Sequence, residues 1–332
     1  MDRKRKYDES YDDSNKVRRG PGQTNAASSA HLVARHYNAR PDVGVEKRKE
    51  SKIIRMRSFN NWVKSVLISS HVREGQHALD MGCGKGGDLR KWAVAKIRSL
   101  VAADIAAVSL DQMQERYKSM NNPTFGAQFY ALDCYSGPSH TQKELLAPRL
   151  PPNTVFDIVS MQFCLHYAFE SEHKARTMLE NVSKNLRSGG WFVGTIPDAN
   201  WIVKRVKQEP KGSFGFGNSI YRIEFDNIKD SDSGGKAGFT KFGCKYMFHL
   251  VDAVDCPEYL VHWLTFEKLA REYGLSLRLR ENFHDFYAQQ SQNEEHQQLL
   301  RRIRVIGGGS PEMSGEEWEA SGIYLAFAFQ KI

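Results

Sequence analysis

The sequence predicts an α/β fold in which helices cover both faces of a mostly parallel sheet of seven strands. Short apolar stretches alternate with helical stretches from about residue 77 to residue 196. Such alternation is typical of parallel sheets built from βαβ units. The first apolar stretch runs directly into a glycine-rich loop, and the next two end in an acid. This combination is typical of Rossmann-like nucleotide-binding folds.

The elements follow in a regular order. A helix is expected from about Lys49 to Ser70, ahead of the alternation. The expected strands of the alternating part are His77–Met81, Arg98–Ile105, Gln128–Asp133, Phe156–Phe163 and Trp191–Ile196. The helices between them are Asp88–Ala95, Ser109–Met120 and Ser171–Leu186. The last helix is expected to stop at Ser188-Gly189-Gly190, because glycine commonly ends helices.

After Pro197 the alternation fades. A helix is expected around Asn200–Lys207, followed by long loops across Lys211–Gly243. The remaining expected elements are strands at Lys245–Leu250, Ser276–Asn282 and Gly322–Gln330, and helices at Leu264–Tyr273 and Glu295–Val305. We interpret residues 198–256 as an insertion into a single folded domain of residues 31–332.

Residues 1–30 are polar and are expected to form a disordered tail, because they hold too few apolar side chains for a core. Their basic runs, Arg3-Lys4-Arg5-Lys6 and Arg18-Arg19, are compatible with a nuclear import signal. The whole chain has 47 Lys and Arg against 39 Asp and Glu, a net charge of +8. This charge suits a polyanionic partner, and equally suits a solubilising surface.

Composition excludes several classes of protein. The five cysteines include no CxxC pair, which disfavours a disulfide framework and a zinc knuckle. No apolar run approaches the roughly 18–20 residues of a membrane helix, and the N-terminus lacks an apolar signal core. We therefore expect an intracellular protein without a membrane span.

The glycine loop Gly82-x-Gly84-x-x-Gly87 matches a dinucleotide fingerprint, with Asp104 placed 22 positions after Gly82. The acids that flank the loop argue against a dinucleotide. A pyrophosphate here would lie close to Asp80 and Asp88, and unit charges ~4 Å apart repel by about 4 kcal/mol near a surface. S-adenosylmethionine carries no phosphate, and its ammonium and sulfonium groups suit an acid-flanked loop.

Two further acids fit the same ligand. Asp104 can bind the two ribose hydroxyls, and Asp133 would lie beside the adenine at the carboxyl edge of the sheet. An ordinary glycine turn with strand-end acids as helix caps is the alternative. Three acids at three successive strand ends disfavour it.

Several stretches together resemble the mRNA cap guanine-N7 methyltransferases, from about His36 to the C-terminus and in the same order. They are His36-Tyr37-Asn38, Arg57–Lys64, Leu79–Leu89 (LDMGCGKGGDL), Asp104-Ile105-Ala106, Gln162–Tyr167 (QFCLHY), Phe242–Tyr246 and Gly322-Ile323-Tyr324. The family usually has Leu at Met81, a volume-conserving change that should be mild. The resemblance implies a class I methyltransferase fold and a nuclear enzyme that methylates the terminal guanine of capped mRNA.

The resemblance also implies two sets of binding residues. The cofactor set is Lys64, Gly82, Asp104, Asp133, Gln162 and Tyr167, to which the loop argument adds Asp88. The cap set is Asn60, Asn61, Lys85, Lys91, Arg116, His166, Glu258 and Tyr324. No catalytic residue in the strict sense and no metal ligand are expected.

The chemistry of the reaction agrees with these sets. Guanine N7 has a free lone pair at neutral pH, so in-line attack on a sulfonium methyl needs no general base and no metal. Orientation alone can lower the barrier by roughly 7–11 kcal/mol. A carboxylate such as Glu258 can accept both N–H groups on the Watson–Crick edge of guanine, and aromatic contacts from His166, Tyr167 and Tyr324 would each add ~1–3 kcal/mol.

Other interpretations of these residues stay open. Lys85, in the loop, and Lys91 and Arg116, on the helices after it, suit a triphosphate, but Lys91 and Arg116 could equally form a solvated helix face. The His166-Tyr167 pair could be core packing after the fourth strand, and Glu258 could belong to an exposed loop.

Two other functions remain as alternatives. The chain could methylate another RNA position or a small molecule, or it could be a cap- or RNA-binding module without activity. The presence of Asp80, Asp104 and Asp133 argues against the module. The expected partner is the capped mRNA 5′ end, with other capping-pathway or transcription proteins as candidates. A monomer in the nucleus, with no membrane contact, is expected.

Overall fold

The computed structural model describes residues 29–39, 50–120, 122–136, 145–210, 212–226, 238–305 and 313–332. The expected disordered tail, residues 1–30, lies outside these residues except for its last two. Those two residues begin helix α1 (Ser29–Ala39), which the sequence did not predict.

The main sheet has seven strands in the order β10-β11-β5-β4-β1-β2-β3. The strands are β1 (His77–Met81), β2 (Ser99–Asp104), β3 (Gly126–Ala131), β4 (Phe156–Gln162), β5 (Leu186–Pro197), β10 (Leu275–Asn282) and β11 (Tyr324–Lys331). Strands β1 to β5 pair in parallel, and β11 runs antiparallel to both of its neighbours. The expected Rossmann-like α/β fold with a mostly parallel seven-stranded sheet is confirmed.

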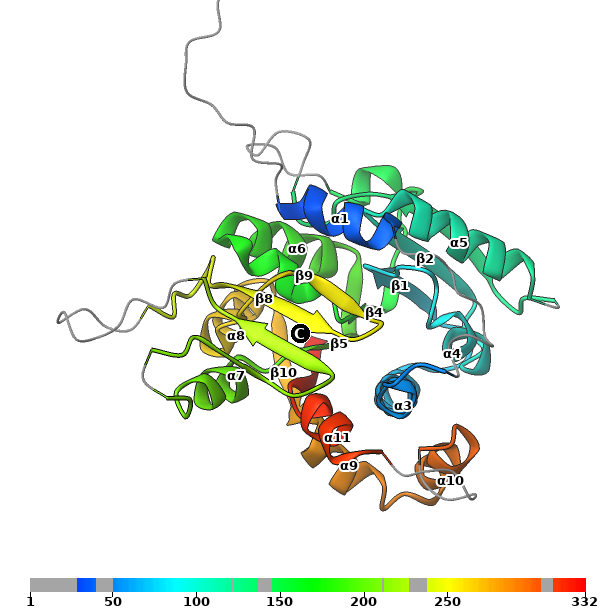
Figure 1. The fold of residues 1–332 in the computed structure, drawn as a ribbon. Coiled ribbons are helices and arrows are strands. Elements are labelled where there is room, and N and C mark those ends of the chain that lie inside the picture. Colours follow the sequence, from blue (N-terminus) through cyan, green and yellow to red (C-terminus); the bar gives the residue numbers. More distant parts are fainter. Residues whose placement is uncertain are drawn as a thin grey trace, which may run out of the picture.

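Helices cover both faces of this sheet (Figure 1). The helices around it are α3 (Ile54–His71), α4 (Leu89–Val94), α5 (Ala107–Lys118), α6 (Glu172–Lys184), α8 (Trp263–Glu272), α9 (Phe283–Gln290) and α11 (Gly315–Ser321). Helix α10 (Glu294–Arg302) packs on α3. Neighbouring residues of β1 point to opposite faces, so that Ala78 packs in the core with α3 and Leu79 packs in the core with α6. Two apolar cores therefore fix the position of the strand ends between them.

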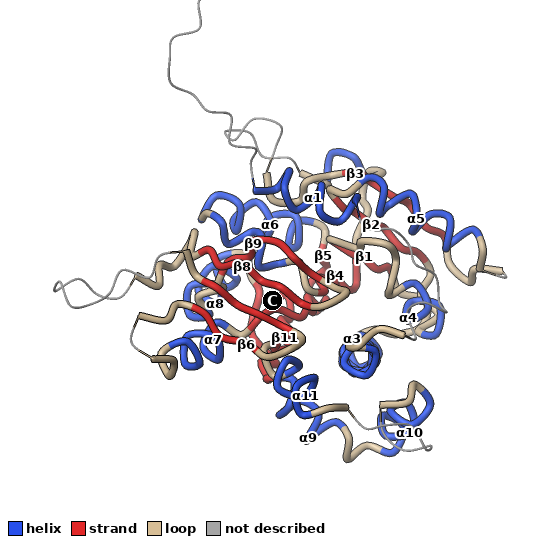
Figure 2. Tube along the Cα trace, viewed as in Figure 1, coloured by secondary structure: helices blue, strands red, loops and turns tan. Residues whose placement is uncertain are grey.

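A second, four-stranded antiparallel sheet follows β5 and α7 (Ala199–Val206). Its strands are β6 (Gly215–Gly217), β7 (Tyr221–Glu224), β8 (Lys245–Leu250) and β9 (Val254–Tyr259). Figure 2 shows the strands of both sheets surrounded by helices. The expectation of long loops across Lys211–Gly243 was wrong at β6 and β7, because alternating apolar residues such as Tyr221 and Ile223 bury one face of β7.

Some boundaries also differ from those expected. Helix α6 ends at Lys184, and Ser188-Gly189-Gly190 lies within β5, so the expected glycine stop was wrong. Gly189 has φ 73°, and the pairing of β4 with β5 shifts register between Phe156 and Ile158, so these residues form an irregularity in the strand. Strand β3 ends at Ala131, which places Asp133 two residues beyond it. Helices α9 and α11 and strand β9 were not predicted.

None of the helices in the described ranges is both long enough and apolar enough to cross a bilayer.

Candidate active site

A cavity of about 260 Å³ lies at the carboxyl ends of β1, β2 and β4. The seven residues predicted for the cofactor all line it: Lys64, Gly82, Asp88, Asp104, Asp133, Gln162 and Tyr167. Other lining residues come from α1, from the segment after β3 and from the region between β4 and α6. The carboxyl edge of a parallel sheet is where α/β folds bind their ligands. The cavity therefore combines the expected place with the expected residues.

The glycine loop approaches the cavity with two left-handed residues. Gly82 has φ 70°, and a Cβ on it would lie 2.6 Å from the Cys164 Sγ. Gly84 has φ 52°, and its backbone N–H donates to the Asp104 Oδ2 at 2.7 Å. Residues that have a side chain rarely adopt such φ angles, and at Gly82 there is also no room for a Cβ.

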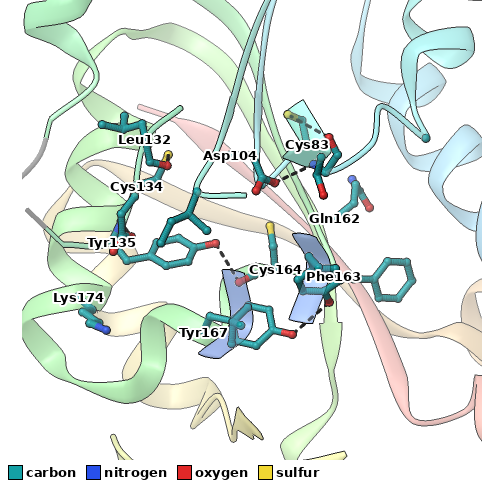
Figure 3. A pocket seen from close by; sticks show the side chains of 18 of the residues that line it. Cys83, Asp104, Leu132, Cys134, Tyr135, Gln162, Phe163, Cys164, Tyr167 and Lys174 are labelled. Atoms are coloured by element: carbon teal, nitrogen blue, oxygen red, sulfur yellow. Dashed lines mark hydrogen bonds between the residues drawn. The ribbon is translucent and has the colours of Figure 1, made fainter. Parts of the chain in front are cut away.

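Asp104 ends β2 and faces the cavity (Figure 3). Its second oxygen, Oδ1, accepts the N–H of Ala106 at 2.7 Å. Burial raises the pKa of Asp104, and the N–H groups of Ala106 and Gly84 partly oppose this by stabilising the carboxylate. The loop and the strand end therefore hold each other in place through one carboxylate.

Two more polar side chains of the cavity are fixed by local bonds. Asp133 accepts the Tyr135 N–H at 2.9 Å and the Ser136 hydroxyl at 2.6 Å. The Gln162 amide donates to the Ser160 Oγ at 3.0 Å and accepts from the Thr195 hydroxyl at 3.0 Å. Because these bonds set the rotamers, the polar atoms are pre-positioned for a ligand.

Asp88 lies between two lysines. Its Oδ1 is 2.8 Å from the Lys64 Nζ and 2.7 Å from the Lys91 Nζ. Burial opposes the ionisation of Asp88, but the two ammonium groups outweigh it and lower its pKa to about 2. The Lys91 Nζ also donates to the Asn61 Oδ1 at 3.0 Å. Asp88, which is predicted for the cofactor, thus contacts Lys91 directly and is linked through Lys91 to Asn61. Both Lys91 and Asn61 are predicted for the cap.

Asp80 lies beneath the loop and is 2% exposed. The Trp92 Nε1 donates to its Oδ2 at 3.3 Å. Burial, reinforced by the charge of Asp88, raises the pKa of Asp80 to about 7. Asp80 is not among the residues that line the cavity, and its hydrogen bond ties the end of β1 to α4.

Beside the cavity, Glu258 on β9 forms a buried polar cluster. Its Oε2 accepts the hydroxyl of Tyr246 on β8 at 2.7 Å, and its Oε1 is 3.4 Å from the His166 Nε2. Tyr324, at the start of β11, lies close enough for the charge of Glu258 to contribute to the raised pKa of its hydroxyl, after burial. Three residues predicted for the cap (His166, Glu258 and Tyr324) are therefore brought together, and Glu258 is a strand residue that is 3% exposed, not a loop residue.

Two residues of the cap set contain buried polar atoms that lack a hydrogen-bond partner within the described part of the chain. They are both ring nitrogens of His166 and the Oδ1 of Asn60. Buried polar groups are nearly always paired, so such atoms call for an explanation, and a ligand that is absent here provides one. The ring centroid of His166 is 4.3 Å from that of Tyr167, which lines the cavity.

The remaining cap residues are more dispersed. Lys85 lies in a turn of the glycine loop, and Arg116 lies in the last turn of α5. Neither lines the cavity or joins the Glu258 cluster in the contacts described above. Within the described ranges, no three His, Cys, Asp or Glu side chains form a group suited to a metal ion.

Residues 22–332 match the family model of the mRNA (guanine-N(7))-methyltransferase domain. The chain belongs to this family. It is 43% identical over 336 residues to the mRNA cap guanine-N(7) methyltransferase of Schizosaccharomyces pombe, covering 99% of this chain and 89% of the relative. It is 41% identical to mRNA cap guanine-N(7) methyltransferase 1 of Oryza sativa subsp. japonica, covering 94% of this chain and 84% of that one.

Two relatives from Cryptococcus neoformans are longer. One is 43% identical over 331 residues, which cover 98% of this chain. The chain spans about half the length of these relatives, 52% and 45%.

Sequence reasoning missed much of the cavity wall in this family member. Val33 and Tyr37 of α1 line the cavity, as do Glu170 and Lys174 near the start of α6. The Tyr37 hydroxyl lies 3.2 Å from that of Tyr167. The His36-Tyr37-Asn38 stretch was the available signal, but it was used only for the resemblance. Figure 3 shows Lys174 on the same side as Tyr135, away from Gln162.

Proposed function

We propose that this chain transfers the methyl group of S-adenosylmethionine to N7 of the terminal guanine of the mRNA 5′ cap. The single observation that carries this is the buried Glu258 carboxylate, held by Tyr246 and placed beside His166, next to a cavity lined by the cofactor residues. A buried carboxylate with one firmly held oxygen suits two adjacent N–H donors, which guanine offers on its Watson–Crick edge.

The cavity fits the cofactor in its chemistry. Asp104 and Asp133 offer acceptors for hydroxyl and amino groups, Lys64 offers an ammonium for a carboxylate, and Asp88 offers a carboxylate for an amino group. When bound, S-adenosylmethionine supplies an electrophilic methyl group on a positively charged sulfur. Transfer of this methyl group to N7 would leave S-adenosylhomocysteine and a cationic N7-methylguanine as products.

The side chains contribute by binding and orientation. N7 needs no deprotonation, so Glu258, His166 and Tyr167 act by aligning the base and excluding water. Because His166 and Glu258 are 2% and 3% exposed, the cluster must open for a base to enter. The partner is capped mRNA; we further propose that the protein acts in the nucleus as a monomer, with capping-pathway or transcription proteins as additional partners.

The test compares two RNAs that differ only in the cap. The protein is incubated with methyl-labelled cofactor and with either GpppG-capped or 5′-triphosphate RNA of the same sequence. Label is expected on the capped RNA alone, and digestion should release it as N7-methylguanosine. Equal labelling of both RNAs, or label on an internal nucleotide, would exclude cap guanine as the substrate.

A further inference from the structure

The bridge formed by Lys64, Asp88 and Lys91 joins the cofactor cavity to the predicted phosphate-binding surface. The three side chains are 13%, 9% and 12% exposed. Lys64 and Asp88 line the cavity, and Lys91 lies one turn further along, on α4. The Asp88 Oδ2 accepts a hydrogen bond from the Lys64 Nζ at 3.0 Å. The Oδ1 lies within ion-pair distance of both ammonium groups but has no hydrogen-bond partner in the described part of the chain.

Three oxygen atoms surround the Lys91 ammonium group. Its Nζ donates hydrogen bonds to Asn61 at 3.0 Å and to the Gly87 carbonyl at 3.4 Å, and it forms an ion pair with the Asp88 Oδ1 at 2.7 Å. A cap phosphate can therefore bind Lys91 only if one of these acceptors is given up. Asp88 is the only charged acceptor of the three, and it holds Lys91 most strongly.

Asp88 also has a competing use. One carboxylate faces two ammonium groups, so the bridge carries an excess of one positive charge. A cation in the cavity would compete with both lysines for Asp88, and an anion would pair with Lys64. The cofactor proposed above carries an amino group and a carboxylate on the same carbon, which matches this pair of demands.

We propose that Asp88 is a positioning residue that couples the two sites: it holds Lys91 in the cofactor-free protein, and releases Lys91 to the cap phosphates when it pairs with the cofactor amino group. This inference rests on the proposed function. It predicts that cofactor binding tightens cap binding and, because coupling between sites is reciprocal, that cap binding tightens cofactor binding by the same factor.

The chain offers a matched control. Lys96 lies just beyond α4, and its Nζ is 3.2 Å from Glu74 in a pair that is 65% and 71% exposed. Replacing Lys96 removes a lysine close to α4 without touching the bridge. Lys91→Met and Lys96→Met therefore separate the loss of one particular ammonium group from the loss of positive charge in general.

The experiment measures GpppG affinity by calorimetry with and without saturating S-adenosylhomocysteine. In the wild type and in Lys96→Met we expect the product to tighten GpppG binding about fivefold to tenfold. In Lys91→Met the ratio of the GpppG affinities with and without product should fall to about one. Asp88→Asn should give the same ratio, and its GpppG affinity without product should rise toward that of the loaded wild type. Guanosine has no phosphate, so its affinity should be the same with and without product in every variant.

An unchanged ratio in Lys91→Met, or weaker GpppG binding in the presence of product, would overturn the coupling. Lys91→Met leaves the Asp88–Lys64 pair in place, so this result does not depend on whether Asp88→Asn folds. Failure of the proposed function gives a different result: the wild type would bind no S-adenosylhomocysteine, or would bind it but bind no GpppG, and this proposal would fall with it. A wild type that binds product and methylates GpppG without any coupling would overturn this inference alone.

Discussion

The cofactor cavity and the Glu258 cluster are built in different ways. The cavity residues come mostly from the ends of consecutive parallel strands, and backbone N–H groups hold them, as Gly84 and Ala106 hold Asp104. The Glu258 cluster joins β9 and β8 of the second sheet to His166 and Tyr324, which are far apart in sequence. One site follows from local chain geometry, and the other depends on docking between two sheets.

The largest effect is expected from a variant that disrupts the cavity alone. Gly82→Ala forces a side chain to 2.6 Å from the Cys164 Sγ at φ 70°. Overpacking and a left-handed side chain each cost about 1–3 kcal/mol, so the loop should be displaced. We therefore expect S-adenosylhomocysteine affinity, measured by calorimetry, to fall on the order of 100-fold.

Gly75→Ala is the control for backbone strain. Gly75 has φ 79°, but a Cβ there has nothing within 4 Å. It should lower the free energy of unfolding and leave product affinity within about twofold. Equal loss of affinity in both variants would show that the loop effect is one of general stability.

The next largest effect is expected from a variant that disrupts the Glu258 cluster alone. Glu258→Ala removes two hydrogen bonds to a charged acceptor, each worth about 1.5–3 kcal/mol, so GpppG affinity should fall by at least about 100-fold. Product affinity should stay within about threefold. Asp104→Ala should show the opposite pattern, and a parallel loss of both ligands in either variant would contradict the separation of the sites.

A smaller effect tests how the cluster is held. Tyr246→Phe removes the hydroxyl that donates to Glu258 at 2.7 Å. Loss of one hydrogen bond to a charged acceptor costs about 1.5 kcal/mol or more, so the KM for GpppG should rise about tenfold with kcat little changed. Tyr117→Phe, which removes a hydroxyl bonded to the Phe125 carbonyl on the α5 side of the sheet, should leave KM unchanged.

The smallest effect concerns Asp80. Burial raises its pKa from 3.8 to about 7, so the folded protein favours the protonated form. Asp80 therefore costs stability as the pH rises from about 4 to about 7, whereas Asn at this position does not titrate. The free energy of unfolding of Asp80→Asn minus that of the wild type, from urea titrations, should be at least about 1 kcal/mol larger at pH 7.5 than at pH 4.5. A pH-independent difference would contradict this.

The comparison also explains what the sequence could predict. Strand β1 and the glycine loop were found because burial and φ constraints act on adjacent residues. Strands β6 and β7 were missed because they have only three and four residues and are stabilised by their neighbours in the second sheet. Strand β9 was missed because it contains a proline, Pro257, which is atypical of a strand interior. Tyr246 was missed as a partner of Glu258 because only pairing between β8 and β9 places them opposite each other. The bridging role of Asp88 depends on the relative placement of α3 and α4, which no local pattern specifies.

A structure of the protein with S-adenosylhomocysteine and GpppG tests the central claim most directly. The terminal guanine should present its Watson–Crick edge to Glu258, with His166 and Tyr324 against the base and N7 facing the cofactor sulfur. The cluster should have opened relative to its present buried state. A guanine bound elsewhere, or one whose N7 points away from the cavity that holds the product, would contradict the account.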